Sequence, residues 1–354
     1  MSLSSQWSSI RLIIGGSIAI AIFCLGVIVD RKAFFACWLA AWWTCAGGVL
    51  GARANLWLHD LSGGDWGVPL RQTWWRISAA MPMLLALMLP LFGAIWHFYP
   101  WSQAGWAPHS SHPEFQTLWL SPRFVTLRLV VYAVLWQALA LMPIRRKGFS
   151  AFGLIVYAIT IGLASVDLIM SLVPQWYASG FGLLAIAMAM KLGFALGVAA
   201  AAKPASRNRP QAGTFAPQIG RDWGNLMLMY ILMWAYLAFT QFLIIWSENL
   251  PHEIAWYVPR LQTDWLWLGI VLTTAGFFAP LLLLLFRAVK QSRPRLRSLA
   301  LILCVLGWLE SVWITLPSIN GMTWHTAWMA PLAMLAMTAL LLAMILSPYQ
   351  EIEA

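Results

Sequence analysis

A single acidic residue lies within the long apolar stretch 151–173, and its position points to proton chemistry. Asp167 is the only charged residue in that stretch, and a carboxylate in hydrocarbon is costly enough that it usually has a function. At helical spacing, Tyr157, Thr160 and Ser171 fall on the same face as Asp167, in a polar stripe about 21 Å long. The stripe is suited to relaying protons. The alternative is a structural acid that pairs with a neighbouring helix.

Three further ionisable residues lie in or near apolar stretches: Arg128, Lys191 and Glu310. We expect Arg128 and Asp167 to pair across antiparallel neighbouring helices near the outer face, because pairing lowers the cost of burying both charges. Lys191 is either neutral or charged against Asp167 or Glu310. For Arg128 and Lys191, a structural role stays as open as a functional one. The predicted proton route comprises Asp167, Tyr157, Thr160, Ser171, Arg128, Lys191 and Glu310.

The composition defines the class of protein that must position these residues. Hydrophobic residues make up 61% of the chain and charged residues only 10%, whereas soluble domains carry about 25% charged residues. The 24 tryptophans fit the same class, because tryptophan concentrates at the two membrane–water interfaces. The sequence therefore predicts an all-α polytopic membrane protein, and the net charge of +10 belongs to short loops between spans.

Ten apolar stretches are long enough to cross a bilayer as helices. Of the 22 Lys and Arg residues, this topology places sixteen on one side and four on the other, while Arg128 and Lys191 lie within spans. The excess marks the cytoplasmic side, so we expect both termini to be cytoplasmic. The predicted spans are 10–29, 33–53, 77–97, 124–144, 151–173, 178–202, 224–247, 265–286, 298–317 and 325–347.

The order of the spans suggests an internal duplication. Residues 1–202 hold the first six spans, residues 203–223 resemble a flexible cytoplasmic linker rich in Pro, Ala and Arg, and residues 224–354 hold the last four. An acid followed seven residues later by proline recurs at an offset of 143, and a small-xxx-small pair that favours close helix contact recurs at an offset of 146. These pairs are Asp167/Pro174 and Glu310/Pro317, and Gly47/Gly51 and Gly193/Gly197.

Several kinds of chemistry lack support in the sequence. The four cysteines lie within apolar stretches with no CxxC pair, which argues against an iron–sulfur cluster or c-type haem on this chain. The six histidines fall in loops or at outer helix ends, as His97 and His325 do, and offer little to a b-type haem. No Walker loop, GxSxG, HExxH or dinucleotide fingerprint is present. We expect no metal and no cofactor to be held by this chain alone.

The outer loop 248–264 is the segment that we expect to bind partner proteins. It combines charges and prolines with two adjacent amphipathic aromatic residues, a composition suited to interface anchors. Contact with lipid headgroups is the alternative. The predicted docking residues are Trp256, Tyr257, Arg260 and Glu253.

Four runs of the sequence resemble the ActF subunits of alternative complex III, and the similarity keeps their order over most of the chain. The runs are HDLSGGDWG (59–67), SVDLIMSLVPQWYASGFG (165–182), NLMLMYILMWAYLAFTQFLIIWSENLPHEIAWYVPR (225–260) and FFAPLLLLLFRAVK (277–290). The resemblance implies an NrfD-like fold, with two four-helix bundles and a flanking helix at each end. One departure is Leu168, where relatives are expected to carry Trp, which leaves the acid in place but changes the local packing.

The resemblance also implies a function and a set of partners. It predicts a membrane subunit of a quinol:cytochrome c oxidoreductase in the bacterial cytoplasmic membrane. Haem c and iron–sulfur clusters would sit on a multihaem cytochrome c and an iron–sulfur subunit at the outer face, beside an ActC-like membrane subunit. Electrons would pass from quinol to cytochrome c or directly to a terminal oxidase.

The role of this chain within such a complex stays open. Quinol oxidation is associated with the related ActC subunit, so quinone or quinol binding here, proton conduction and scaffolding are all compatible with the sequence. The chain is either a non-catalytic subunit or one that handles quinone or protons. A secondary transporter is the alternative from another class, since the apparent repeat permits it. However, the two units run in parallel and the sequence shows no broken midspan helices of the kind often found at substrate sites.

Overall fold

Helices are the regular elements of the computed structural model, which describes residues 3–108, 113–142, 147–202 and 216–346. Within these ranges, eight helical segments are long and apolar enough to cross a membrane. This establishes a polytopic helical membrane protein. The eight segments are α2 (Arg31–Ser62), α7 (Pro122–Leu141), α8 (Lys147–Leu168) with η2 (Met170–Leu172), α9 (Phe181–Ala201), α10 (Pro217–Glu248), α13 (Trp265–Thr273) through η3 (Thr274–Phe278) to α14 (Ala279–Leu285), α16 (Arg293–Thr315) with η4 (Leu316–Ser318), and η5 (Trp324–Trp328) with α17 (Met329–Ile345).

Two of the ten predicted spans are not among these eight segments. The predicted span 10–29 falls within α1 (Leu3–Val29), a helix of 27 residues that is continuous over that range. The predicted span 77–97 belongs to a chain of three helices, α3 (Val68–Ser78), α4 (Met81–Ala86) and α5 (Leu89–Phe98), which bends by 52° before α5. Proline at the start of α4 and of α5 explains the interruptions, because proline cannot continue a helix from the preceding turn. The expectation of no broken span was therefore wrong here.

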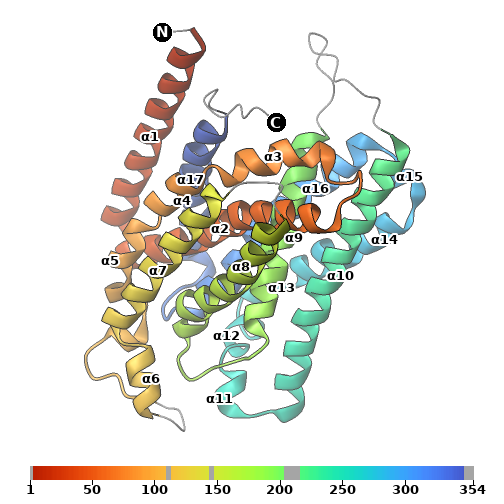
Figure 1. Cartoon of the computed structure of the whole chain (residues 1–354). Coiled ribbons are helices and arrows are strands. Elements are labelled where there is room, and N and C mark those ends of the chain that lie inside the picture. The colour runs from red at the N-terminus through yellow and green to blue at the C-terminus, as the bar shows by residue number, and fades with distance from the viewer. Residues whose placement is uncertain (1–2, 109–112, 143–146, 203–215, 347–354) are drawn as a thin grey trace.

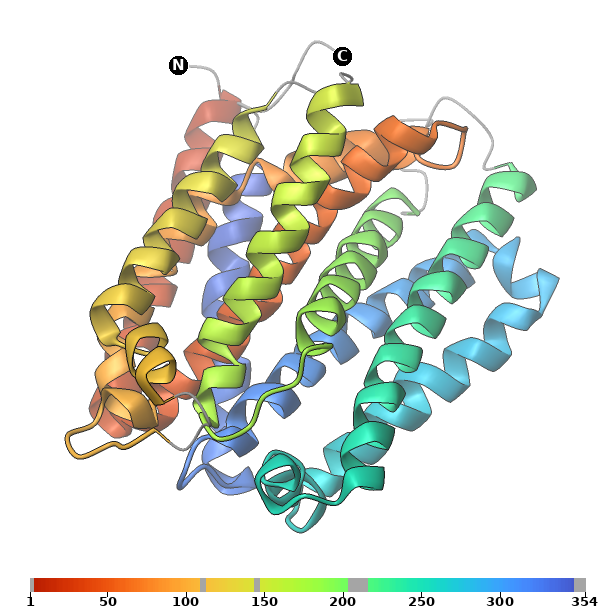
Figure 2. The ribbon, with the colours of Figure 1, turned by 60° about the horizontal axis from the view of Figure 1, so that its bottom comes forward.

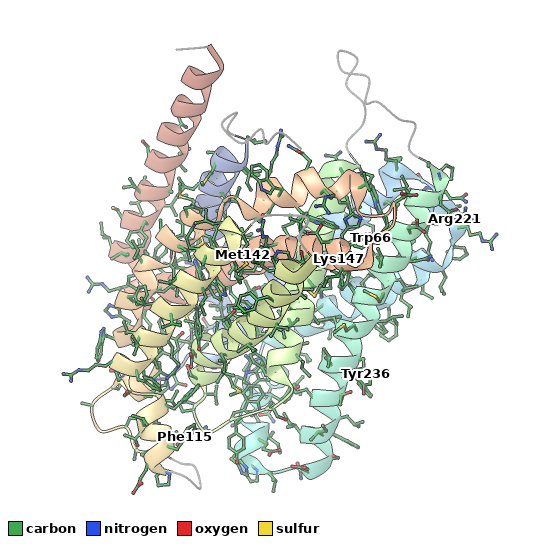
Figure 3. The ribbon with its side chains drawn as sticks, viewed as in Figure 1. Trp66, Phe115, Met142, Lys147, Arg221 and Tyr236 are labelled. Atoms are coloured by element: carbon green, nitrogen blue, oxygen red, sulfur yellow. The ribbon has the colours of Figure 1, made fainter. Side chains whose placement is uncertain are left out.

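The remaining short helices lie in the connections between these segments. They are η1 (Pro100–Ser102), α6 (Pro113–Trp119), α11 (Pro251–Ile254), α12 (Val258–Leu261) and α15 (Arg287–Lys290). Figure 1 shows α6, α11 and α12 at the end of the bundle opposite the start of α1. Arg221 and Phe115 mark these two ends in Figure 3. Helix α1 begins and α17 ends at the same end of the bundle (Figure 1).

Helix α2 forms the centre of the bundle. Its most apolar 18-residue window is entirely buried, and α9, α17, α8, α3 and α16 pack around it (Figure 2). Such a helix needs no polar face, because it is surrounded by protein. The helix also continues to Ser62, beyond the predicted end at residue 53. His59, which we expected in a loop, therefore lies on the last turn of α2.

The closest approach in the core joins α2 to α9 at the predicted small-residue pairs. A Cβ atom added to Gly51 would lie 1.9 Å from the Ala189 carbonyl oxygen, and one added to Gly193 would lie 2.2 Å from the Gly51 carbonyl carbon. At Gly47 the nearest atom, the Ala189 Cα, would be 3.6 Å away, an ordinary contact. The prediction of close helix contact at these glycines is confirmed, with Gly51 and Gly193 at the crossing point.

The helices on either side of this crossing pack in two related groups. In the first, α2 packs against α3 and α8, and α7 packs against α8 and α4. In the second, α9 packs against α10 and α16, while α14 packs against α10 and α13 against α16. The terminal helices α1 and α17 pack against each other and against α2.

The predicted linker between the two parts of the chain differs from the structure at its second half. Helix α10 begins at Pro217, seven residues before the predicted span, so residues 217–223 are helical. Pro217 fits this start, since proline favours the first turn of a helix, where its missing N–H is not needed. Residues 203–215 of the predicted linker lie outside the described residues.

The α2–α9 crossing generates a stability prediction. Gly51→Ala should lower the free energy of unfolding by roughly 1–3 kcal/mol, because the added methyl group meets backbone that cannot move without separating the helices. Gly47→Ala, one turn away on the same helix, should be neutral or slightly stabilising, because alanine favours helix more than glycine does. The measurement is the temperature at which half of the detergent-solubilised monomer is lost on size exclusion. Equal effects of the two substitutions would contradict the assigned crossing point.

Candidate functional site

Asp167 forms a buried cluster with Arg128 and Tyr132, which we call the Asp167 cluster. The Arg128 Nε donates to Oδ2 of Asp167 at 2.9 Å, and its Nη2 donates to Oδ1 at 2.8 Å. The Tyr132 hydroxyl donates to Oδ2 at 2.8 Å. Asp167 has no exposed surface. The predicted pairing of α7 with α8 through these charges is confirmed, and its bidentate geometry is the strongest form of such a contact.

The surroundings of Arg128 explain how its charge is accommodated. Its guanidinium lies 4.0 Å from the ring centre of Trp119 and 4.5 Å from that of Phe124, and its Nη2 also donates to the Trp119 carbonyl at 2.8 Å. Aromatic faces attract such a cation. Arginine keeps its proton in proteins, so the groups of this cluster that can exchange a proton are Asp167 and Tyr132.

The polar stripe on α8 and η2 is buried but is not a continuous chain of hydrogen bonds. The Thr160 hydroxyl donates to the Val156 carbonyl at 2.7 Å, and the Ser171 hydroxyl donates to the Asp167 carbonyl at 2.6 Å, both within their own helical segment. The Tyr157 hydroxyl is buried without a hydrogen-bond partner among the described residues. The stripe therefore provides buried hydroxyl groups, without direct contact from one to the next.

A second buried ion pair joins Lys191 of α9 to Glu310 of α16, and with Trp234 of α10 it forms the Glu310 cluster. The Lys191 Nζ donates to Oε2 of Glu310 at 3.0 Å, and the Trp234 Nε1 donates to Oε1. The same ammonium lies 3.8 Å from the Trp234 ring centre. Of the two partners predicted for Lys191, the structure selects Glu310. Glu310 is 4% exposed.

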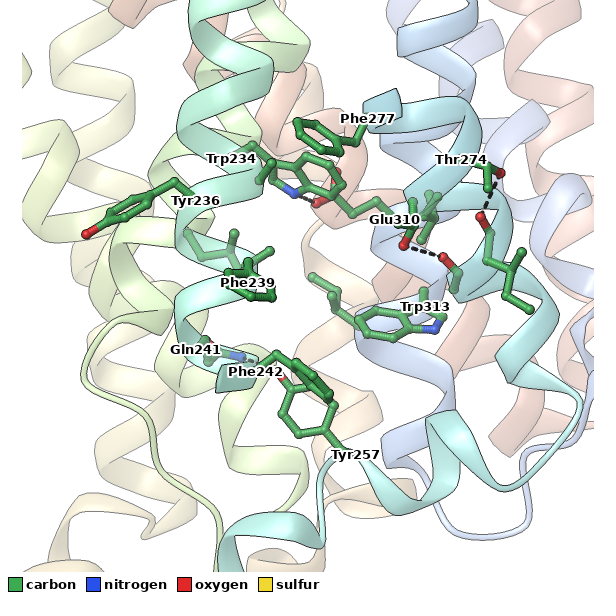
Figure 4. A pocket seen from close by; sticks show the side chains of 18 of the residues that line it. Trp234, Tyr236, Phe239, Gln241, Phe242, Tyr257, Thr274, Phe277, Glu310 and Trp313 are labelled. Atoms are coloured by element: carbon green, nitrogen blue, oxygen red, sulfur yellow. Dashed lines mark hydrogen bonds between the residues drawn. The ribbon is translucent and has the colours of Figure 1, made fainter. Parts of the chain in front are cut away.

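A large cavity reaches the Glu310 cluster from between α10, α16 and the segment from α13 to α14. Its volume is about 870 Å³, which is within the usual size of small-molecule sites. Figure 4 shows Glu310 and Trp234 in one part of the cavity and Gln241, Phe242 and Tyr257 in another. The wall includes η3, a π-helical turn before Pro280. Such turns often occur at functional sites.

A polar contact connects the two halves beside the α2–α9 crossing, and our sequence reasoning missed it. The Tyr230 hydroxyl of α10 donates to the Asn55 Oδ1 of α2 at 2.6 Å, and the Asn55 Nδ2 donates to the Met190 carbonyl at 3.0 Å. Asn55 has no exposed surface. Met190 directly precedes Lys191 on α9. The available signal was an amide between apolar residues, beyond the predicted end of this span at residue 53.

A further cluster at the end of α2 also escaped prediction. The Asp60 carboxylate accepts from Arg71 of α3 and, at 3.0 Å, from the Ser150 hydroxyl of α8. The Arg71 Nη1 also contacts His59 Nδ1 at 3.0 Å. In the sequence, the run 59–67 was notable only as part of the family resemblance, which did not indicate these contacts.

The residues predicted to bind a partner protein lie largely inside the chain. Trp256, Tyr257 and Arg260 are buried, and only Glu253 is partly exposed. Trp256 stacks on Trp176 with ring centres 4.8 Å apart. Contrary to our expectation, the Trp256/Tyr257 pair is therefore no exposed anchor, because its aromatic surface is already covered. Docking through the exposed part of loop 248–264 stays a prediction.

Arg260 has an internal role in this loop. Its Nη2 donates to the Ile314 carbonyl and the Ser318 hydroxyl, both at 2.7 Å, so its charge lies at the C-terminal end of α16. The negative end of a helix dipole stabilises a cation there. Burial lowers the pKa of Arg260 well below its ordinary value and raises the pKa of Tyr257 to about 12. Tyr257 therefore keeps its proton at neutral pH.

The described residues contain no group of three or more His, Cys, Asp or Glu side chains placed to bind a metal ion. No protein-family model matches the chain, and no curated protein matches it significantly. The two ion-paired clusters and the cavity beside Glu310 are the features of the described residues that could carry chemistry.

The Asp167 cluster generates a prediction about coupled charges. Arg128→Gln alone should destabilise the protein by about 3–5 kcal/mol, because it leaves a buried carboxylate without its cation. The double variant Arg128→Gln/Asp167→Asn should recover much of that loss, since neither charge then remains. The free energy of unfolding, measured by denaturant titration in detergent, checks this.

The Lys191/Glu310 pair supplies the matched comparison. Lys191→Met should cost a similar amount and Lys191→Met/Glu310→Gln should recover it, because this pair is also buried. Additive effects in either pair would show that the two charges do not stabilise each other.

Proposed function

We propose that this chain is a membrane subunit of a bacterial quinol-oxidising complex of the alternative complex III type, in which its buried carboxylates carry protons. The observation that supports this most is the pair of buried acids, Asp167 and Glu310, each bonded to a cation from a different helix. Packing alone does not require carboxylates in apolar helices, and such residues usually mark proton or ion pathways.

The wider proposal follows the family resemblance. Ten spans in an NrfD-like arrangement would comprise α1 and the bent segment α3–α5 as well as the eight long helices. Haem c and iron–sulfur clusters would be held by a multihaem cytochrome c and an iron–sulfur subunit, beside an ActC-like membrane subunit. The acceptor would be cytochrome c or a terminal oxidase. The complex would lie in the cytoplasmic membrane, with both termini of this chain on the cytoplasmic side.

The two acids differ in the chemistry that their partners allow. Arg128 stays protonated, and together with Tyr132 it directs three hydrogen bonds to Asp167. Lys191 is different, because an ammonium can give up its proton when it is buried. The lysine can therefore take part in proton transfer at the Lys191–Glu310 contact, whereas at the Asp167 cluster the Tyr132 hydroxyl donates to the carboxylate and the arginine supplies only hydrogen bonds.

The broken segment α3–α5 is the one structural observation that favours the alternative, a secondary transporter, because discontinuous helices often form substrate sites.

Purification from native membranes in mild detergent distinguishes a respiratory subunit from a transporter. A subunit of a respiratory complex should copurify with a multihaem cytochrome and an iron–sulfur protein, identified by mass spectrometry and haem absorbance. A chain that is always recovered alone would overturn the proposed complex.

Asp167→Asn tests the proton-carrying role. The amide keeps the shape of the carboxylate but cannot titrate. Because it also leaves the buried Arg128 without its anion, the double variant Arg128→Gln/Asp167→Asn, in which neither charge remains, is measured beside it. Complexes of either variant that assemble should lose at least about tenfold in quinol oxidation or proton release. Glu310→Gln is the comparison from the second half, where the sequence shows a weaker polar stripe and we expect a smaller loss. Assembly on native gels is the control. Normal turnover and normal proton release in assembled Asp167→Asn complexes would rule out a relay through this acid.

A further inference from the structure

Positive charge gathers at the turn between α14 and α16. Residues 287–297 contain five Lys or Arg residues and no acid. Three of these cations, Arg287, Lys290 and Arg295, lie on α15 or bond to it, and we call them the α15 patch. Figure 1 places α15 near the start of α10. Among the described residues, no carboxylate, that of Asp222 on α10 included, has an oxygen within 4.0 Å of a side-chain nitrogen of the patch.

Contacts with neighbouring backbone and side chains hold two of these cations in place. Lys290 packs against Gly224 of α10, where an added Cβ would lie 2.6 Å from the Lys290 Cγ. Its Nζ donates to the Asn225 Oδ1 at 2.6 Å. The Arg295 Nη1 donates to a backbone carbonyl of α15 at 3.4 Å. Both groups keep further N–H donors, since an ammonium has three and a guanidinium five. The third cation, Arg287, is exposed.

This arrangement goes beyond what orientation in a membrane requires. The positive-inside rule depends on how many Lys and Arg residues a short loop carries, and it needs no fixed position for their side chains. Here Arg287 and Lys290 share one turn of α15, and Arg295 is bonded to the same turn. Like charges held close together repel each other. An anion between them would replace this repulsion with attraction.

The surface beside the patch is apolar and belongs to a segment of membrane-spanning length. Leu282, Leu285 and Phe286, at the end of α14, are 57%, 62% and 64% exposed. The segment Trp265–Leu285 is long enough to cross a bilayer, so these side chains would contact acyl chains. Arg287 directly follows Phe286, which puts the patch at the level of the headgroups. A ligand that contacts both surfaces has a negative headgroup and acyl chains.

We propose that the α15 patch binds the headgroup of an anionic phospholipid whose acyl chains lie along the end of α14. Its phosphate oxygens accept hydrogen bonds from the three cations, in the way that basic pockets beside membrane helices hold acidic lipids. A headgroup with two phosphates, as in cardiolipin, neutralises more of the patch than a single phosphate does and should bind more tightly. The proposal is independent of the proposed function, because it requires neither quinol nor partner subunits.

The test is a lipid titration of the full-length chain in an uncharged detergent, with the first bound lipid measured by native mass spectrometry. The probes are cardiolipin, phosphatidylglycerol and phosphatidylcholine with the same oleoyl chains. A fourth probe, glycerophosphoglycerol, has the phosphate headgroup without acyl chains. We expect cardiolipin to bind most tightly and phosphatidylcholine at least about fivefold more weakly than phosphatidylglycerol. Added salt should weaken the binding of the two anionic lipids.

Two results of this titration would overturn the proposal. Equal affinity for the three lipids would mean that only apolar surface is recognised. Glycerophosphoglycerol that binds as tightly as phosphatidylglycerol would mean that the patch is a site for soluble phosphate compounds, to which the apolar side chains contribute nothing.

Substitutions then locate the site. Arg287→Gln and Arg295→Gln should each raise the dissociation constant for phosphatidylglycerol about fivefold, the contribution of one cation near an anionic lipid. The matched control is Arg76→Gln, which removes the same charge from α3 at the same end of the bundle (Figure 1) and should leave this constant unchanged. Lys290→Gln would also break the contact with Asn225, so the exposed Arg287 provides the variant that keeps the fold. An unchanged size-exclusion profile checks this.

The variants give the proposal a second way to fail. If Arg287→Gln/Arg295→Gln binds phosphatidylglycerol as the unmodified chain does, the lipid lies elsewhere. If Arg76→Gln weakens binding as much as Arg287→Gln, only the total charge matters and there is no site at α15. The affinity for phosphatidylcholine should stay the same in all of these variants, because that lipid carries no net charge.

Discussion

The contact between α2 and α9 at Gly51 and Gly193 is the constraint on which the arrangement of both halves depends. Two backbones meet there with no side chain between them, which is how helices pack tightly where the surrounding solvent gives no hydrophobic driving force. Asn55 adds hydrogen bonds to the Gly51 and Met190 carbonyls beside the crossing. Because Lys191 follows Met190, this crossing also fixes where the ammonium can reach α16. The ion pair in the second half thus depends on glycines contributed by both halves.

The sequence was informative where the cost of burial restricts the choice of residue. Asp167 and Arg128 lie in neighbouring helices joined by a short loop, so antiparallel packing of these two helices brings the two side chains together. The structure contains this ion pair. Lys191 left two partners open, because its contact with Glu310 spans 119 residues and depends on how α9 and α16 pack. The glycine pairs indicated close contact, but not which glycine lies at the crossing, since this depends on the rotation of each helix about its axis.

Other features followed from packing that composition does not reveal. Loop 248–264 carries charges and prolines and therefore resembled a surface, yet Arg260 lies at the end of α16 with its charge satisfied by backbone carbonyls. Trp256 is covered by Trp176, which lies far away in the sequence. The length of α2 was underestimated because its last three turns contain Arg53, His59 and Asp60, residues that usually mark a helix leaving the membrane. Arg53 bonds to carbonyls at the end of α7, and His59 and Asp60 contact α3 and α8, so these polar groups are accommodated inside the protein.

The two halves use a similar acid at a similar position and differ in what surrounds it. Around Asp167, Arg128 and Tyr132 fill the space with three hydrogen bonds to the carboxylate, and aromatic rings cover the guanidinium. Around Glu310, the lysine and the Trp234 indole leave a cavity that the carboxylate helps to line. A carboxylate with free acceptor capacity beside a cavity can interact with a molecule in that cavity, whereas the hydrogen bonds of the Asp167 carboxylate all go to groups of its own cluster. The two buried acids therefore lie in different environments, and Glu310 is the one whose side chain lines a cavity.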